Sequence, residues 1–241
     1  MGVTTRGVIV EVCVDSSAGL AAAVAGGADR IELCSALALG GLTPSAGFIA
    51  EAAGCGVPVM AMIRPRAGGF VWTEAELTVM EADIAAVRAA GLAGVVLGAS
   101  LADGRLDGPA LRRLIVAARG LDLTLHRCFD LVPDMDAALE EAVAAGFRRI
   151  LTSGGAPTAA EGAVRIEALV RQASGRVAIM AGSGVTARTA ALLTSLGVRE
   201  VHSSCSETVR VAGNGPAMGF GPEMERRTSA ALVRALRLAV G

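Results

Sequence analysis

The stretch "ADRIELC" (28–34) carries the pattern that decides the fold. Within it, Glu32 and Cys34 alternate with apolar residues, and alternation by twos is the period of a β-strand. The strand-like stretch before it, "VIVEVCV", repeats the Glu-x-Cys pattern with Glu11 and Cys13. Two consecutive strands that each place a carboxylate and a thiol on one face indicate a polar interior to which both strands contribute.

Strand-like and helix-like segments alternate along the whole chain of 241 residues. We expect strands over 8–14, 30–34, 58–64, 94–99, 123–129, 148–154, 177–183 and 200–206. We expect helices over 16–26, 45–53, 73–90, 108–119, 134–145, 158–173, 186–196 and 228–240, the last preceded by a Gly-rich stretch. Eight such units predict an α/β fold, a single (β/α)₈ TIM-type barrel domain over 1–241. An open doubly wound sheet is the alternative, but the first turn, "VDSSAG", lacks its G-x-G-x-x-G fingerprint.

The composition excludes several functions. All 22 basic residues are arginine, and Schiff-base aldolases and P-loop proteins both need a lysine. With a net charge of −1, no tyrosine and a single tryptophan, nothing favours nucleic acid or a membrane surface as a partner. Five cysteines without a recognisable export signal are typical of reduced thiols, which predicts a cytoplasmic protein.

The unusual polar residues gather at the expected C-terminal ends of the strands, where barrels of this kind hold their chemistry. We expect the opposite ends to carry mainly Gly, Ala and Val. Buried carboxylates need partners, and Arg64 and Arg127 are the expected partners of the two glutamates because guanidinium binds carboxylate bidentately. Strand parity turns the following side chains inwards: Glu11, Cys13, Glu32, Cys34, Met62, Arg64, His126, Cys128, His202 and Ser204.

The same residues allow a purely structural interpretation. A Glu–Arg network can be architecture alone, and a buried cysteine is often small apolar filler. We favour a functional site because barrel centres are usually filled by Val, Ile and Leu. Cys55 follows a helix at the opposite end and is interpreted as structural, whereas Trp72 either covers the mouth or packs its loop.

The turn "GSG" (182–184) opens a helix after the seventh expected strand. Backbone N–H groups at such a position can hold an anion, and many barrels bind phosphate after strands seven and eight. Ser183, Gly184, Ser203 and Ser204 together favour an anion site, although a tight turn alone also needs glycine. No C-x-x-C, H-x-x-x-H or H-E-x-x-H spacing predicts a zinc site, but thiolates from adjacent strands suit Cu(I).

Seven motifs in this order closely resemble the CutC family of copper-homeostasis proteins. The motifs are "EVCVDS", "GADRIELCS", "GGLTPS", "MIRPR", "HRCFD", "RILTSGG" and "EVHSS", and the resemblance runs from about residue 9 through 217–219. It implies a TIM-like barrel, a cytoplasmic protein, a homodimer or higher homo-oligomer, and Cu(I) as cofactor, bound through Cys13 and Cys34. The family usually has "HRAFD", so Cys128 adds a third inward thiol near His126 or is a larger filler.

Two functions therefore stand side by side. The first is a copper-homeostasis protein with the two cysteines as metal ligands. The second is a lysine-independent barrel enzyme acting on a small anionic substrate that bears a phosphate or carboxylate. In it, His126 is a general acid or base that Asp130 or Glu32 orients. The expected substrate-binding residues are Glu11, Arg64, Arg127, Ser153, Gly182, Ser183, Gly184, His202 and Ser203.

Overall fold

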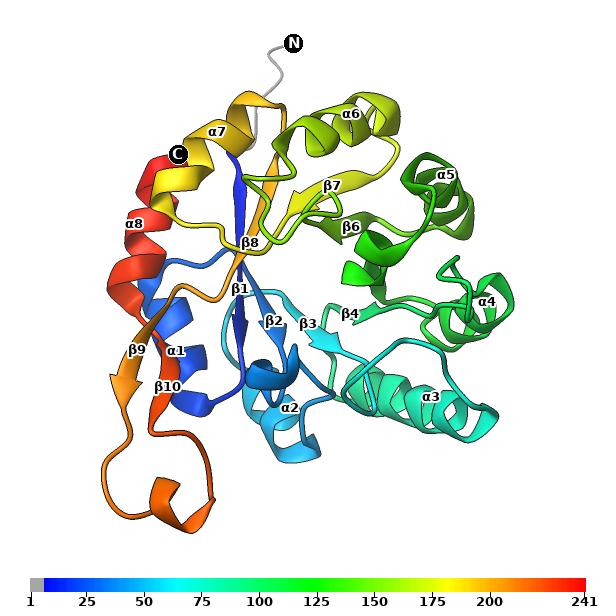
Figure 1. The fold of residues 1–241 in the computed structure, drawn as a ribbon. Coiled ribbons are helices and arrows are strands. Elements are labelled where there is room, and N and C mark those ends of the chain that lie inside the picture. Colours follow the sequence, from blue (N-terminus) through cyan, green and yellow to red (C-terminus); the bar gives the residue numbers. More distant parts are fainter. Residues whose placement is uncertain (1–6) are drawn as a thin grey trace.

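A computed structural model describes residues 7–241 of the chain, and its eight parallel strands close into a barrel surrounded by helices (Figure 1). The strands are β1 (Ile9–Val14), β2 (Arg30–Leu33), β3 (Val59–Met62), β4 (Gly94–Leu97), β5 (Asp122–Leu125), β6 (Arg149–Thr152), β7 (Ala178–Ala181) and β8 (Glu200–Ser203). The helices are α1 (Ser17–Gly26), α2 (Ala46–Ala52), α3 (Glu74–Ala89), α4 (Gly108–Ala117), α5 (Met135–Ala145), α6 (Ala163–Ala173), α7 (Ala187–Ser195) and α8 (Ala230–Val240). The predicted (β/α)₈ barrel is confirmed. Across these residues, no helix combines the length and the apolar character that a bilayer crossing requires.

Capping residues explain where the helices begin and end. Thr73 and Glu76 form a capping box at the start of α3, in which each side chain accepts a hydrogen bond from the other residue's backbone N–H. The Asp134 carboxylate accepts two backbone N–H bonds at the start of α5. Gly27 and Gly146 end α1 and α5 with φ values of 88° and 89°, which glycine adopts without a Cβ clash. These short helix-to-strand links carry the chain back to the same end of the barrel after each unit.

An ionic layer fills the end of the barrel opposite its C-terminal mouth. Arg30 donates hydrogen bonds to Glu11 and Glu200, and Arg149 donates to Glu200 at 3.1 Å and to Asp122 at 2.9 Å. Both arginines are buried. The expectation that this end carries mainly Gly, Ala and Val is therefore wrong. Paired charges instead fill the space that apolar side chains usually occupy in such barrels.

The fifth strand ends earlier than expected. β5 stops at Leu125, and a short 3₁₀ helix over Arg127–Leu131 replaces the rest of the predicted strand. Strand parity does not continue into this turn, so Cys128 packs in the apolar core and not at the mouth. Burial raises the pKa of its thiol to about 12. The expected third inward thiol is therefore wrong, and Cys128 is filler.

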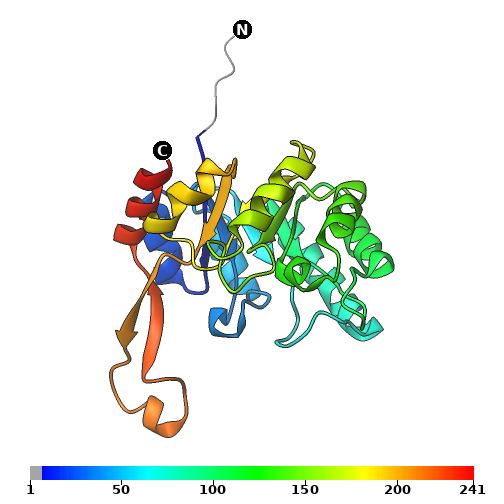
Figure 2. The same cartoon turned by 45° about the horizontal axis from the view of Figure 1, so that its top comes forward.

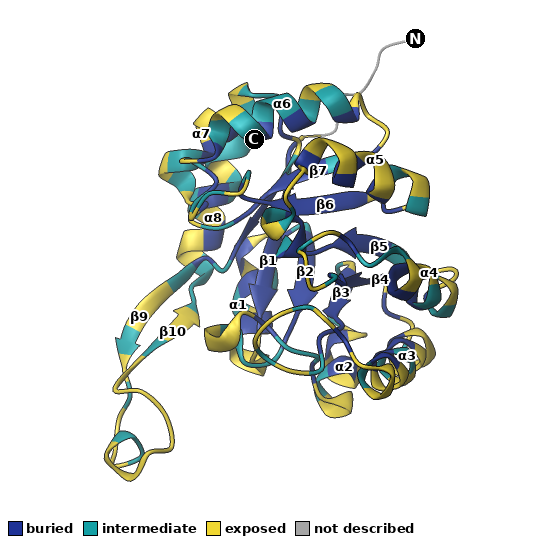
Figure 3. Cartoon of the chain, turned by 45° about the vertical axis from the view of Figure 1, so that its right-hand side comes forward, coloured by how far each residue is buried: buried dark blue, intermediate teal, exposed yellow. Residues whose placement is uncertain are grey.

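A hairpin leaves the barrel after β8, where a strand to residue 206 and a Gly-rich stretch were expected. Its strands β9 (Ser206–Arg210) and β10 (Met224–Thr228) pair antiparallel. The hairpin projects away from the barrel (Figure 2), and its surface is mostly exposed, in contrast to the buried barrel strands (Figure 3). Near its tip, the Met218 and Phe220 side chains are 70% and 85% exposed.

Candidate functional site

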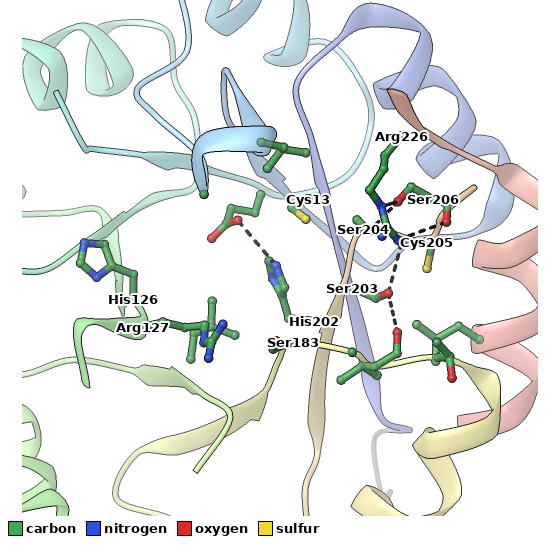
Figure 4. Close-up of a pocket in the computed structure, with 18 of the residues that line it drawn as sticks. Cys13, His126, Arg127, Ser183, His202, Ser203, Ser204, Cys205, Ser206 and Arg226 are labelled. Atoms are coloured by element: carbon green, nitrogen blue, oxygen red, sulfur yellow. Dashed lines mark hydrogen bonds and ion pairs between the residues drawn. The ribbon is translucent and has the colours of Figure 1, made fainter. Parts of the chain in front are cut away.

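A cavity of about 450 Å³ lies at the C-terminal mouth of the barrel (Figure 4). Among the residues predicted for the site, Cys13, Glu32, Arg64, His126, Arg127, Ser183, Gly184, His202, Ser203 and Ser204 line it. Glu11, Cys34, Asp130, Ser153 and Gly182 are not lining residues. The structure therefore brings together most of the predicted residues in one concave space of a size suited to a small ligand.

Three metal-binding side chains meet on the β1, β2 and β8 wall. One donor atom each from Cys13, Glu32 and His202 lies within 4.8 Å of the other two, and all three residues are buried. His202 Nε2 lies 3.7 Å from a Glu32 oxygen, and His202 Nδ1 lies 2.8 Å from a Glu11 oxygen. The register explains the meeting, because Cys13 is paired with Glu32 across β1 and β2.

Two carboxylates hold His202 in its charged form. Burial disfavours the imidazolium, but the charge of Glu32, with a further contribution from Glu11, outweighs burial and raises the pKa of His202 well above its usual value. Burial also opposes ionisation of Glu11, yet Arg30 and then His202 lower the pKa of Glu11 to about 2. Burial raises the pKa of Glu32, which is the weaker acid of this triad. His202 on this wall is therefore protonated on both ring nitrogens. It lies between Glu11, which is ionised, and Glu32, which is the weaker acid.

Cys34 lies beside this cluster but is not one of its three donors. Its thiol donates to Glu32 at 3.5 Å and packs against Met60, Met62 and Val96 in a small apolar cluster. Burial, followed by the charge of Glu32, raises the pKa of the Cys34 thiol well above its usual value. A proton must leave this thiol before it can bind a metal. Copper binding by the pair Cys13 and Cys34 stays a prediction.

His126 occupies the opposite wall in a fixed neutral form. Its Nδ1 accepts a hydrogen bond from the Cys128 backbone N–H at 3.2 Å, so the ring proton is on Nε2. Burial and then the charge of Arg64 lower the pKa of His126 to about 3. The expectation that Asp130 or Glu32 orients this ring is wrong, because the group that orients it is the Cys128 backbone N–H. Nε2 has no hydrogen-bond partner among residues 7–241.

Arg64 spans the loops that follow β2 and β3. Its guanidinium donates to the backbone carbonyls of Leu39, Gly41 and Gly68 at 2.9, 3.0 and 2.8 Å. In the described part of the chain it forms no ion pair with any carboxylate. The expected pairing of Arg64 with the mouth glutamates is therefore wrong. Arg30 reaches Glu11 instead, from the layer below.

The expected role of Arg127 as a partner of those glutamates is also wrong. Arg127 Nε donates to Asp130 at 2.6 Å, and its NH2 donates to the Ser153 hydroxyl at 2.7 Å. Asp130 also accepts from the Thr152 hydroxyl at 2.5 Å and from the Ser153 backbone N–H at 3.1 Å. This network ties the turn after β5 to the end of β6 and positions the Arg127 guanidinium at the cavity.

The predicted anion turn lies at the far end of the cavity. Ser183 and Gly184 have φ values of 74° and 69°, and the Ser183 hydroxyl donates to the Pro157 carbonyl at 2.7 Å. The backbone N–H groups of both residues donate to no protein group within 7–241. Arg226 of β10 also lines the cavity and donates to the Ser206 hydroxyl at 2.8 Å. Anion binding at this turn stays a prediction.

The loop between β3 and α3 settles the position of Trp72. Its indole N–H donates to the Gly98 carbonyl at 2.9 Å, and Arg66 lies 4.8 Å from the ring centroid. Trp72 is buried and does not line the cavity, so it packs the loop and does not cover the mouth. Phe70 of the same loop lines the cavity instead.

Sequence reasoning missed three residues of this region. Arg30 stands two positions before Glu32, so extending the strand alternation back by two positions would have placed it inside the barrel. Phe70 stands two positions before Trp72, and only the loop conformation shows which aromatic faces the cavity. Arg226 reaches the cavity from the hairpin, which carried no recognised strand signal.

Comparisons with known proteins agree with the motifs. The CutC family model matches residues 8–207. A CutC family protein of Sinorhizobium medicae is 60% identical over 236 residues, which are 95% of both chains, and one of Caulobacter vibrioides is 54% identical over 94% of both. A crystal structure from Streptococcus agalactiae, described as a proposed copper homeostasis protein CutC, is 36% identical with a TM-score of 0.78, covering 82% of this chain and 98% of that one. The chain belongs to the CutC family.

Proposed function

We propose that this protein is a copper-homeostasis protein that binds Cu(I) at Cys13, Glu32 and His202. The observation that carries the proposal is the convergence of three buried donors within 4.8 Å of one another at the cavity wall. A second observation supports it, because Glu32 Oε1 is buried without a hydrogen-bond partner among residues 7–241. A buried carboxylate oxygen without a partner is costly, and a bound cation removes that cost.

The surroundings of the cluster favour metal binding. A carboxylate that accepts from the outer ring nitrogen of a histidine fixes the ring and strengthens its other nitrogen as a ligand. Glu11 stands in this relation to His202, with Nε2 left facing Glu32 and Cys13. Thiolate and imidazole are ligands that Cu(I) accepts. Binding releases the proton stored on His202, so the affinity for copper rises with pH.

The test is an anaerobic Cu(I) titration against a competing chelator. We expect Cys13→Ser and His202→Gln to weaken binding by at least about tenfold, as changes around metal sites do. Cys55→Ser is the matched control, because this half-buried thiol lies outside the cavity. Circular dichroism verifies that each variant is folded.

Cys34→Ser separates the two possible ligand sets. If Cys34→Ser binds Cu(I) with unchanged affinity, the ligands are Cys13, Glu32 and His202. A loss equal to that of Cys13→Ser supports the pair of cysteines predicted from the sequence. Wild-type affinity in both Cys13→Ser and His202→Gln would remove copper from this wall altogether.

A second candidate function is an enzyme acting on a small anionic substrate. The observation that favours it is the neutral His126 on the wall opposite the metal-binding cluster, whose Nε2–H has no partner among residues 7–241. In this function His126 donates a hydrogen bond to the substrate, and Arg127 attracts its charge. An anion that binds the metal-free protein would support it, and a cavity that binds only copper would not.

We also propose a cytoplasmic homodimer or larger homo-oligomer. All five cysteines are free, which fits a reducing compartment. The exposed Met218 and Phe220 near the hairpin tip are apolar groups that a second copy can cover. Sedimentation velocity of the full chain measures the assembly.

A further inference from the structure

Two buried cationic or donor groups on the β3–β5 side of the cavity have hydrogen-bonding capacity that the protein does not use. The Arg64 Nε and the His126 Nε2 are both shielded from solvent, and neither has a partner among residues 7–241. Arg64 is 6% exposed and His126 is 3% exposed. Leaving such donors unbonded is unfavourable, so most buried donors in proteins are satisfied.

The chemistry of both donors is defined by their neighbours. The backbone N–H of Cys128 occupies Nδ1 of His126, which makes Nε2 a donor and not an acceptor. Arg64 is a permanent cation that bonds only backbone carbonyls in the described chain. Carbonyls do not neutralise its charge. Within residues 7–241 no carboxylate pairs with Arg64, so this side of the cavity offers a cation and a neutral donor to an anion.

Phe70 connects the two donors. Its ring centroid lies 4.6 Å from that of His126 and 5.1 Å from the Arg64 Cζ. Phe70 is half-buried and follows Gly68 and Gly69 in the loop after β3. The ring therefore lies against both groups, on a loop whose two preceding glycines are exposed.

We propose that the cavity binds a small organic molecule through its oxyanion, a carboxylate or phosphate group, which Arg64 and His126 grip once Phe70 turns aside. Charge-assisted bonds from a guanidinium and an N–H suit either oxyanion. Leu37, Met62 and Leu151 also line the cavity and provide apolar contact for the organic part of the ligand. The inference rests on the second candidate function, the binding of a small anionic molecule beside His126, and does not depend on copper, because the metal-binding cluster lies on the other wall.

The test is a titration of inorganic phosphate, and separately of acetate, into metal-free protein labelled with ¹⁵N-histidine. The chain has two histidines, so His126→Phe assigns the signals. We expect the Nε2–H signal of His126 to shift and saturate in the wild type. The preferred oxyanion is the probe with the lower dissociation constant.

Variants locate the site. His126→Phe keeps an aromatic ring beside Phe70 and is expected to weaken binding by at least about tenfold, the usual effect of losing a hydrogen bond to a charged group. Arg64→Lys keeps the cation, loses the Nε donor and is expected to weaken binding as well. Phe70→Ala uncovers the donors and is expected to tighten binding. Arg105→Met, at an exposed arginine outside the cavity, is the matched control and should leave binding unchanged.

Two results would overturn the inference. One is an unmoved His126 signal at saturating phosphate and acetate, in the wild type and also in Phe70→Ala. The other is oxyanion binding that both His126→Phe and Arg64→Lys retain at wild-type strength, which places the oxyanion away from these two donors. Near-UV circular dichroism confirms that each variant is folded. The NMR titration of the wild type tests the inference even if a variant fails to fold. Copper titration is a separate measurement, so either proposal can fail alone.

Discussion

The two histidines of the chain face the same cavity, but His202 is positively charged and His126 is neutral. His202 is flanked by Glu11 and Glu32, so its proton is held by negative charge. His126 has an apolar ring, a backbone amide and a cation around it, so a proton on its second nitrogen is excluded. Because both residues are histidines, only their surroundings make His126 a neutral hydrogen-bond donor and His202 a cation.

At the residue scale, we predict that His126 stays neutral far below the usual histidine range. Its pKa of about 3 lies below the reference value of 6.5, so the stability from burying the neutral ring is complete above pH 6.5 and is lost as the pH falls towards 3. An ¹⁵N NMR titration from pH 8 to pH 4 should show an unchanged Nε2–H form at His126.

His202 is the internal control in the same spectra. Its pKa is raised, so it should stay doubly protonated where a free histidine has already lost a proton. A His126 midpoint near 6.5 would contradict the sealed environment described for this ring.

Residue-level prediction from the sequence succeeded where strand alternation applied and failed at strand starts. Alternation placed Glu11, Cys13 and Glu32 inside the barrel, as observed. The same rule extended two positions back puts Arg30 inside, but the alternation was not followed back to the start of the strand. Partners could not be predicted, because Arg30 meets Glu200 across 170 positions of sequence, and only barrel closure brings them together.

At the element scale, the barrel and its appendage differ in how the sequence specifies them. The barrel strands are apolar and punctuated by glycine, which made all eight recognisable. β9 and β10 read "SETVR" and "MERRT", with charges on exposed faces and no buried partner sheet. Exposed strands lack the apolar alternation on which recognition depends, so the hairpin was not predicted.

We predict that the barrel folds without this hairpin. Replacing residues 208–226 by Asn-Gly joins the paired residues Glu207 and Arg227 through a two-residue turn. The removed segment contributes nothing to the main apolar core, so the thermal midpoint should change by less than about 4 °C, the shift that corresponds to roughly 1 kcal/mol. Differential scanning calorimetry measures it.

The matching of the CutC family model to residues 8–207 supports this outcome, because it ends where the hairpin begins. Loss of the cooperative transition in the shortened chain would show instead that the hairpin supports α8 or the barrel. Reduced self-association with an intact transition would assign the exposed tip to an interface between copies.

At the scale of the whole molecule, a barrel with charged groups in its interior should be sensitive to acid. Glu11 has a pKa of about 2, below the reference value of 4.5. Its contribution to stability is therefore complete above pH 4.5 and is lost as the pH falls towards 2, and it is on the order of 3 kcal/mol. Urea unfolding between pH 7 and pH 2.5 measures this fall.

Glu11→Gln isolates the contribution of this carboxylate. The variant should be about 3–5 kcal/mol less stable at pH 7, because Arg30 and His202 lose a buried partner. It should also lose stability less steeply below pH 4.5. Equal slopes in the two proteins would mean that Glu11 is not ionised in the native barrel.

The ionic layer beneath the mouth closes the inner end of the cavity. Arg30 and Arg149 are locked between carboxylates below the ligand space, so nothing passes along the barrel axis. A metal ion and an organic anion bound as proposed would both have to enter and leave through the mouth. A ligand bound closer to the mouth would then slow the release of the other, so the exchange rate of each should depend on whether the other is present.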